Sequence, residues 1–232
     1  MRGGDKCLIF PRRSRRAVVL CDGPPPPGKL VEYWLDGADL FVCADRAGHP
    51  YYELPRLPDV VIGDFDTLAD LPRPDRSNIR FIEEAEQDTT DSDKALRLVL
   101  AEGCEEAVLL GATGWLLDHT LHNCRLPERY AGRLRVCLSD EHSTTVRIGP
   151  GETTDWELPA GRSFSLLPLN VPARGVDLDG ADWPLRAAVM GHDAPTAISN
   201  RTTDDTLRIA VVSGSLLFVL RHEPPPLPPV RG

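Results

Sequence analysis

Two aspartates that follow a short apolar run have the spacing needed to bind one metal ion together. Asp64 and Asp66 come directly after residues 60–62, which are Val, Val and Ile, and Gly63. A β-branched run that stops at a glycine is typical of a buried parallel strand followed by a loop. Residues two apart in an extended segment point the same way, so both carboxylates can face a hard cation that also binds phosphate oxygens. Taken alone, such a pair is equally typical of an ordinary turn.

A second group of charges stands at the start of a helical pattern and favours the metal-phosphate interpretation. Asp88, Asp91 and Asp93 crowd the beginning of an apolar-periodic run, with Lys94 among them. Thr90 followed three residues later by Asp93 resembles a capping box. One aspartate is enough for a cap. Three aspartates with a lysine at a helix N-terminus suit a polyphosphate that is bound by a metal ion, a cation and backbone N–H groups together.

The elements that must position these residues predict a doubly wound, mostly parallel α/β sheet. Buried-strand patterns occur at residues 16–21, 40–44, 60–62 and 107–110, and helical patterns occur at 30–35, from 91 onward and at 115–123. Each predicted strand ends in an acid, a glycine or both. The carboxyl ends of parallel strands meet at one edge of the sheet, so we expect these polar residues to form a single site there.

The pattern changes near residue 134, where short β-rich runs begin. They occur at residues 134–138, 144–148, 163–167, 176–178, 185–189 and 207–220, the last with a turn at 213–214. Regular short strands separated by Gly and Pro predict a β-sandwich. We therefore expect an α/β catalytic domain at 15–132, a β-sandwich domain at 133–222, and flexible tails at 1–14 and 223–232.

Composition excludes several classes of function. The chain has 232 residues, is 41% hydrophobic and carries a formal net charge of -9, which is typical of a globular protein and argues against nucleic-acid binding. The six cysteines form no C-x-x-C pair, and Cys21 and Cys43 end or lie within apolar runs, so buried free thiols are favoured over disulfides. The apolar runs near the N-terminus are too short for a signal segment or a membrane span, so we expect a cytoplasmic protein without a membrane partner. The basic segment at 12–16 is expected to be a solvated lead-in to the first strand.

Five segments in register resemble the thiamin pyrophosphokinase family. They are CAD at 43–45, GDFDT at 63–67, QDTTDSDKAL at 87–96, GATG followed by DHTLHN between 111 and 123, and SN at 199–200. The resemblance covers residues 17–222. It implies a transferase, a kinase of thiamin diphosphate biosynthesis, that moves the pyrophosphoryl group of ATP to the hydroxyl of thiamin and releases AMP. It also implies Mg²⁺ as cofactor and a homodimer with active sites between subunits.

The resemblance also implies roles for individual residues. Catalysis would fall to Asp64, Asp66, Asp91 and Lys94. Mg²⁺ would be bound by Asp45, Asp64, Asp66 and Asp88. The nucleotide and its phosphates would be bound by Asp88, Asp91, Lys94, Asp118, Arg46 and Thr113. Thiamin would be bound by Trp183, Ser199 and Asn200, with the Trp183 ring facing the cationic thiazolium.

Two places depart from the family pattern. A glycine pair that the family commonly has after CAD is Arg46-Ala47 here, and Trp115-Leu116 replaces a glycine and an arginine before the DH pair. By the resemblance, loss of that arginine would remove a phosphate or nucleotide contact. We expect Arg46 to bring its own guanidinium to the phosphates instead, and Trp115 to reshape the nucleotide pocket.

Several alternatives stay open at this point. The enzyme could act on another hydroxymethyl heterocycle such as a pterin, or the protein could bind nucleotide or thiamin without turnover, although the full acidic set argues against the latter. Trp183 could be a core residue of the sandwich. His119 and His122 could form a metal pair, but packed or capping roles are favoured because their spacing alone is weak evidence.

Overall fold

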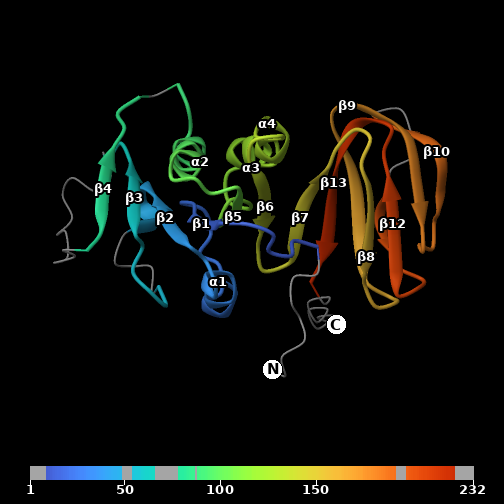
Figure 1. Ribbon diagram of the computed structural model, residues 1–232, viewed down its shortest axis with the longest axis horizontal. Helices are drawn as coiled ribbons and strands as arrows, with labels where there is room; N and C mark the ends of the chain where they lie inside the picture. The colour runs from blue at the N-terminus through green and yellow to red at the C-terminus, as the bar shows by residue number, and fades with distance from the viewer. Residues whose placement is uncertain (1–8, 49–53, 66–77, 87, 192–196, 223–232) are drawn as a thin grey trace, which may run out of the picture. The chain divides into compact units, whose positions relative to one another are not determined.

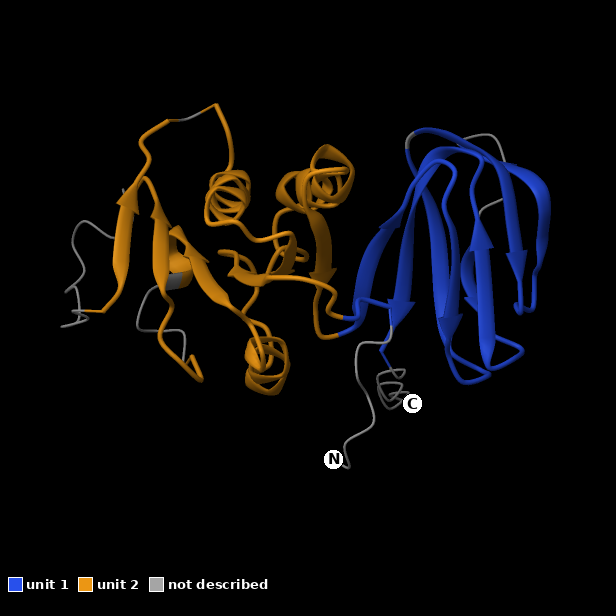
Figure 2. Cartoon of the chain, in the orientation of Figure 1, with its two compact units in different colours: residues 1–11, 142–232 blue, residues 12–141 orange. Residues whose placement is uncertain are grey.

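The computed structural model describes residues 9–48, 54–65, 78–86, 88–191 and 197–222. The chain divides into two compact units, residues 12–141 and residues 142–232 with 1–11 (Figure 2). The described part of each unit has its own buried apolar residues. Asp66 lies outside the described residues, as do the proline-rich tail at 223–232 and Gln87.

Unit 12–141 is built on a parallel sheet with the strand order β4-β3-β2-β1-β5-β6. Its strands are β1 (Arg16–Leu20), β2 (Leu40–Ala44), β3 (Val60–Gly63), β4 (Arg80–Glu83), β5 (Glu106–Leu110) and β6 (Arg135–Ser139). The chain moves outward from β1 to β4 and then returns to β5 on the other side of β1. The strand order therefore reverses between β1 and β5, which is where open α/β sheets bind ligands.

Helices cover both faces of this sheet. They are α1 (Gly28–Leu35), α2 (Asp91–Ala101), α3 (Leu117–Asn123) and α4 (Leu126–Arg129), with a 3₁₀ turn η1 (Asp45–Gly48) after β2. Figure 1 shows α1 on one face and α2, α3 and α4 on the other. Every residue of β1, β2, β3 and β5 is buried, as expected for parallel strands covered on both sides. These observations confirm the predicted parallel α/β sheet.

Unit 142–232 is antiparallel in its described part. Its strands are β7 (Ser143–Ile148), β8 (Thr153–Glu157), β9 (Ser163–Asp179), β10 (Leu185–Met190), β11 (Ala197–Arg201), β12 (Thr206–Ala210) and β13 (Ser213–Arg221). The long strand β9 pairs with β11 and β13 along its first part and with β10 and β12 along its second part. The rings of Phe164 and Trp156 each lie 5.7 Å from that of Phe218, in the apolar core.

Three expectations about the boundaries were wrong. The run at 134–138 was assigned to the β-sandwich, but β6 pairs in parallel with β5, so the first unit extends beyond the predicted boundary at 132/133. The predicted turn at 213–214 belongs to the start of β13, where the register with β9 shifts between Ser213 and Ser215. Gly214 has a φ of 75°, and a Cβ added to it would lie 2.7 Å from the Pro172 carbonyl oxygen. In the predicted flexible arm at 1–14, the described Ile9 and Phe10 are buried.

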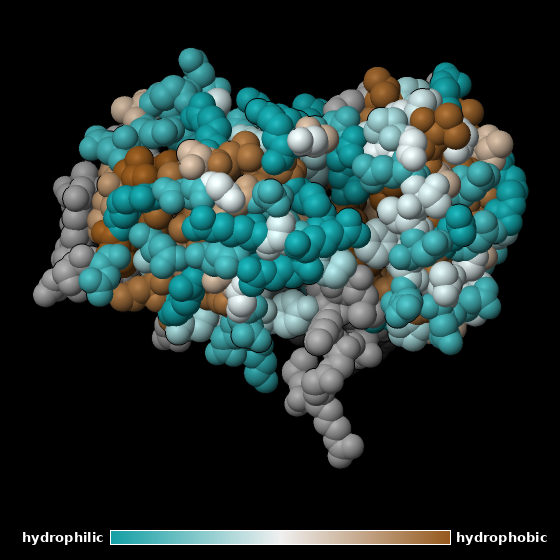
Figure 3. All heavy atoms as spheres, viewed as in Figure 1, coloured by the Kyte–Doolittle hydropathy of each residue, from teal (hydrophilic) through white to brown (hydrophobic). Residues whose placement is uncertain are grey.

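The surface is largely hydrophilic on the face seen in Figure 3, with apolar groups scattered between the polar ones. Among the described residues, no helix combines the length and the apolar character that a membrane span requires. The described cysteines, Cys21, Cys43, Cys104, Cys124 and Cys137, are free thiols, and all except Cys124 are buried.

Candidate functional site

A pocket of about 290 Å³ opens at the carboxyl edge of the parallel sheet, where the strand order reverses. Its walls come from the loop after β1, the loop after β5, the start of α2 and the start of α3. The residues that line it include Asp22, Arg46, Asp64, Thr90, Asp91, Lys94, Thr113, Trp115 and His119. The pocket thus brings together Asp22 and Asp64, which follow the strands β1 and β3, and Asp91, which begins helix α2.

Helix α2 presents its N-terminus and a lysine to this pocket. Thr90 is the N-cap, and its side chain accepts a hydrogen bond from the Asp93 backbone N–H at 3.4 Å, which confirms the first half of the predicted capping box. Lys94 is only 2% exposed, and its Nζ lies 3.2 Å from Asp91 Oδ1. A buried ammonium beside a helix N-terminus is suited to a polyphosphate.

The second half of the capping box is wrong, because Asp93 makes a different set of contacts. Its side chain is 1% exposed, Oδ1 accepts a hydrogen bond from the Tyr130 hydroxyl at 2.5 Å, and Oδ2 lies 3.1 Å from Arg129 Nη2. Burial, followed by the hydrogen bond to Asp93, raises the pKa of Tyr130, so the hydroxyl remains a donor. This contact ties the first turn of α2 to the end of α4 and fixes the backbone that carries Lys94.

Arg46 reaches Asp22 and Trp115 at the pocket wall. Its Nε and Nη2 lie 2.9 Å and 2.8 Å from Asp22 Oδ2, and its guanidinium carbon lies 6.0 Å from the centre of the Trp115 ring. The sequence singled out Arg46 and Trp115 as departures from the family pattern. The structure places the two side chains in one cluster.

Backbone strain is concentrated around the same edge. Asp45, Phe65 and Trp115 have φ values of 43°, 59° and 32° and follow β2, β3 and β5. Such values are unfavourable for non-glycine residues and cluster at functional sites. Gly63 is needed here for a different reason: a Cβ on it would lie 2.9 Å from the Cβ of Asp45. The close approach of β3 to η1 thus requires glycine in GDFDT.

Cys21 lines the pocket but is unsuited to nucleophilic catalysis. Burial raises the pKa of its thiol to about 11, although the Ser92 hydroxyl, which donates to Cys21 Sγ at 3.4 Å, has the opposite effect. A thiol with this pKa stays protonated at neutral pH, and the thiolate is the reactive form. Phosphoryl transfer through Cys21 is therefore unfavourable.

Other predicted site residues lie outside the pocket lining. Asp45 is 7% exposed and packs against Gly63. Asp88 is exposed at the approach to α2, and the exposed Asp118 accepts the backbone N–H of His119 at 2.9 Å. Thr113 does line the pocket, and its hydroxyl donates to Asp140 Oδ2 at 2.8 Å.

The donor set of the pocket fits Mg²⁺ in the way that nucleotide enzymes use it. Among the described residues that line the pocket, three are carboxylates, Asp22, Asp64 and Asp91, and two are permanent cations, Arg46 and Lys94. Its formal charge is thus negative, so a polyphosphate needs a dication to enter. No group of three His, Cys, Asp or Glu side chains capable of holding a metal occurs within the described residues. Mg²⁺ commonly uses one or two carboxylates together with substrate phosphates and water.

The two histidines have different surroundings. His119 lines the pocket, whereas His122 Nε2 lies 3.2 Å from Thr90 Oγ1. The sequence favoured packed or capping roles for these histidines over a metal pair, and the contact of His122 agrees with a packed role. Sequence reasoning expected Asp22 at this edge of the sheet but assigned no site role to Asp22, Thr90 or His119. Asp22 carried the signal of an acid at a strand end, which was the signal that selected Asp64.

The three residues predicted to bind thiamin lie together in unit 142–232. The Trp183 backbone N–H donates to Asn200 Oδ1 at 3.2 Å, and Asn200 Nδ2 donates to the Trp183 carbonyl oxygen at 3.0 Å. Asn200 is fully buried, while Trp183 is 63% exposed, so the alternative that Trp183 is a core residue is wrong. The Ser199 hydroxyl accepts from Arg221 Nη2 at 2.9 Å. The buried Asn200 thereby fixes the backbone that presents an exposed indole ring.

The fold and the pocket define an α/β protein with its ligand site beyond the carboxyl ends of parallel strands. Two family models match the chain: "Thiamin pyrophosphokinase, catalytic domain" over residues 31–138 and "Thiamin pyrophosphokinase, vitamin B1 binding domain" over residues 150–216. The chain belongs to the thiamin pyrophosphokinase family.

Individual relatives agree with this assignment. Thiamine pyrophosphokinase 1 of Oryza sativa subsp. japonica is 28% identical over 203 residues, which cover 75% of this chain and 76% of the rice protein. The crystal structure of thiamine pyrophosphokinase from Bacillus subtilis has a TM-score of 0.77 at 22% identity, covering 90% of this chain and 100% of that one. Yeast thiamin pyrophosphokinase also has a TM-score of 0.77, at 18% identity, covering 93% and 89%. At these identities the two structures support the fold alone.

Proposed function

We propose that this protein is a thiamin pyrophosphokinase that transfers the pyrophosphoryl group of ATP to the hydroxyl of thiamin, giving thiamin diphosphate and AMP. The observation that carries the proposal is the pocket that joins Asp64, Asp91 and Lys94 where the strand order of the parallel sheet reverses. Membership of the family supplies the acceptor and the reaction class. The family match offers no support for a pterin acceptor or for a binding protein without turnover.

The residues of the pocket have complementary roles in this reaction. Lys94 and the N–H groups at the start of α2 bind the phosphates. Asp64 and Asp91 would bind Mg²⁺, with Asp66, Asp45 and Asp88 as the further predicted ligands. Bound Mg²⁺ neutralises phosphate charge during the transfer. Because the buried Lys94 is held by Asp91 at 3.2 Å, the cation is positioned before substrate arrives, and little reorganisation is needed during the transfer.

Thiamin recognition is assigned to unit 142–232. The exposed indole ring of Trp183 offers an aromatic face to a cationic thiazolium, and Asn200 holds the backbone of Trp183 in place. Ser199 would donate or accept a hydrogen bond at the aminopyrimidine. We further propose that this antiparallel unit is the β-sandwich of the family, and that the protein is a cytoplasmic homodimer. Free thiols are typical of reducing compartments.

A turnover assay with product identification tests the proposal. Purified protein is incubated with ATP, Mg²⁺ and either thiamin or a hydroxymethylpterin, and the nucleotide and ester products are separated. We expect AMP and thiamin diphosphate in equal amounts. ADP with thiamin monophosphate would contradict pyrophosphoryl transfer, and AMP formed only with the pterin would contradict the acceptor.

The metal-binding role of the first acidic cluster is tested separately. Asp64→Asn keeps the shape of the side chain and removes a charge that can bind Mg²⁺. We expect turnover to fall by about 100-fold or more, with part of the loss recovered at high Mg²⁺. Glu84→Gln is the matched control, because Glu84 is an acid of the same unit that pairs with Arg97 and does not line the pocket. Normal turnover of the Asp64 variant would show that this carboxylate does not bind the metal.

A further inference from the structure

The Arg46 guanidinium pairs with Asp22 and lies over the ring of Trp115, and both residues line the pocket. Asp22 Oδ2 lies 2.9 Å from Nε and 2.8 Å from Nη2, and the Trp115 ring centre lies 6.0 Å from the guanidinium carbon. The three residues come from three segments: the loop after β1, the turn η1 after β2, and the loop after β5. All three line the pocket that contains Lys94.

Trp115 has an unfavourable backbone conformation. Its φ of 32° is rare for a bulky side chain, and the residue is nevertheless 68% exposed. An exposed ring in a strained backbone does not stabilise the fold through burial. Such outliers are typical of sites where the strain serves binding. In this chain the strained backbone brings the indole face to the guanidinium, where cation–π attraction favours a fixed position.

The ion pair is also a weak explanation for stability. The side chains of Arg46 and Asp22 are 43% and 28% exposed, and exposed ion pairs contribute little to folding. A guanidinium has more N–H donors than one carboxylate oxygen accepts. Arg46 can therefore remain paired with Asp22 through Nε and Nη2 and still donate to a phosphate oxygen, in the planar geometry for which arginine is suited.

We propose that Asp22 and Trp115 are positioning residues that hold Arg46 as the second polyphosphate-binding cation of the pocket, beside Lys94. The inference rests on the proposed function, because the nucleotide supplies the polyphosphate. It assigns to Asp22 a role in substrate binding rather than in metal binding. Two acids of the pocket, Asp22 and Asp91, would then each fix one phosphate-binding cation in place.

The same unit contains a matched control for this cluster. Arg56 Nη2 lies 3.3 Å from Asp59 Oδ2, and its guanidinium carbon lies 5.6 Å from the centre of the Phe41 ring. The Arg56 side chain is 40% exposed, close to the value for Arg46, but Arg56 does not line the pocket. Arg56→Gln thus removes a similar acid–arginine–aromatic cluster without touching the proposed site.

Steady-state kinetics with a double-mutant cycle test the proposal. We expect Arg46→Gln to raise the KM for ATP by about tenfold while kcat stays within about twofold, since one charge-assisted contact to bound nucleotide is lost. Asp22→Asn and Trp115→Leu should each raise KM by about threefold to tenfold, and Trp115→Phe, which keeps an aromatic face, should restore most of the affinity. Adding Asp22→Asn to Arg46→Gln should cause no further change, because Asp22 acts through Arg46. Arg56→Gln should match the unsubstituted protein.

Three results would overturn the inference: additive effects of Asp22→Asn and Arg46→Gln, a lower KM in Asp22→Asn, or a fall in kcat with KM unchanged. Calorimetric binding of inorganic tripolyphosphate with Mg²⁺ separates this inference from the proposed function. If the unsubstituted protein makes no AMP, the proposed function fails. Weaker tripolyphosphate binding by Arg46→Gln and by Asp22→Asn would then still support the positioning role, and unchanged binding would reject it.

Discussion

The two ends of the strands β1, β5 and β6 use charged residues in opposite ways. Arg16, Glu106 and Arg135 open the three strands and lie beside one another in register. The pocket lies at the other end of β1 and β5. Both ends contain carboxylates and cations, so a difference between them reflects the surroundings of these residues rather than their type.

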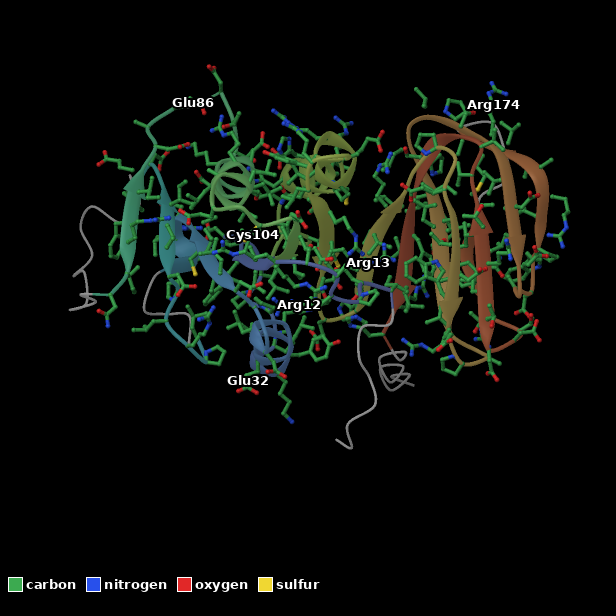
Figure 4. All side chains as sticks on the ribbon, viewed as in Figure 1. Arg12, Arg13, Glu32, Glu86, Cys104 and Arg174 are labelled. Atoms are coloured by element: carbon green, nitrogen blue, oxygen red, sulfur yellow. The ribbon has the colours of Figure 1, made fainter. Side chains whose placement is uncertain are left out.

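At the amino end the central carboxylate is saturated. Glu106 is fully buried; Oε2 accepts from Arg16 Nε at 3.0 Å and Nη2 at 2.8 Å, and Oε1 accepts from the Arg13 backbone N–H at 3.1 Å and from Arg135. Arg13 and its neighbour Arg12 are labelled in Figure 4, where the chain leads into the sheet. The basic segment at 12–16 was expected to be solvated, but its Arg13 backbone N–H and its Arg16 side chain bind Glu106. Such an end stabilises the fold and leaves the carboxylate little capacity for a ligand.

At the carboxyl end the described ion pairs are Arg46 with Asp22 and Lys94 with Asp91, and both carboxylates stay partly exposed. The side chains of Asp22 and Asp91 are 28% and 35% exposed, and they lie beside Arg46 and Lys94. These ion pairs position the cations at the pocket. The difference indicates that the burial of a carboxylate, more than its presence at a strand end, separates a structural acid from one that serves binding.

The largest effect should follow from opening the amino-end network. Glu106→Gln leaves two arginines beside a neutral amide in a buried site, so we expect the free energy of unfolding to fall by about 3–5 kcal/mol. Turnover per folded molecule should be unchanged. Urea denaturation measures the first quantity, and kinetics below the transition measure the second. Glu102→Gln, at an exposed pair with Arg80, should cost less than about 1 kcal/mol. Equal costs for the two variants would remove the contrast.

The converse change removes the buried cation of the pocket. Lys94→Met preserves the length of the side chain and should lower kcat/KM by about 100- to 1,000-fold, which is typical for loss of one group that stabilises transferred charge. Stability should change little, because Asp91 remains partly exposed to water. Lys29→Met on the exposed side of α1 is the control. If Lys94→Met lowered the free energy of unfolding as much as Glu106→Gln, Lys94 would stabilise the fold, as the charged residues of the amino end do.

The sequence predicts much of this unit because its signals are local. The apolar runs locate β1, β2, β3 and β5, the rule that parallel strands end at one edge points to Asp64, and the acidic start of α2 points to Asp91. The cap at Thr90 is likewise a local pattern. Each of these predictions depends on residues that are adjacent or a few positions apart.

The elements and contacts that the sequence did not predict have weak local signals or join residues far apart in the chain. Strand β4 (Arg80–Glu83) is short and partly exposed and carries little apolar signal. The β9 sequence includes Pro168, Pro172 and Gly175, which break the pattern and suggest two separate strands. The Asp22–Arg46 pair joins loops 24 positions apart, and the Asp93–Tyr130 hydrogen bond spans 37. No local periodicity encodes such pairs, so only the folded chain reveals them.

A smaller effect is expected from the contact that anchors α2. Tyr130→Phe deletes the hydroxyl that donates to the buried Asp93 carboxylate at 2.5 Å, so we expect a loss of about 1–3 kcal/mol in the free energy of unfolding. Turnover should fall by only a few-fold, since Lys94 keeps Asp91 as its neighbour. Thermal and urea unfolding measure the loss. Tyr33→Phe, at a 38% exposed tyrosine, is the control and should be neutral. A large fall in turnover without loss of stability would show that Tyr130 acts in the site and does not mainly stabilise the fold.

The smallest effect concerns pH at the rim of the amino-end network. The backbone N–H of Arg16, followed by the Arg12 guanidinium, holds the pKa of Asp39 below its ordinary value. A carboxyl whose pKa is lower in the folded state contributes stability that is complete above its unfolded pKa, about 3.9, and is lost as the pH falls through the folded pKa. Asp39→Asn should therefore be less stable than the unsubstituted protein at pH 6, by less than about 1 kcal/mol because the pair is partly exposed. In urea titrations at pH 6, 4 and 3 that difference should shrink with acid, as the unsubstituted protein loses the contribution that the variant lacks. A difference that stayed constant from pH 6 to pH 3 would show that the charge of Asp39 does not stabilise the folded state.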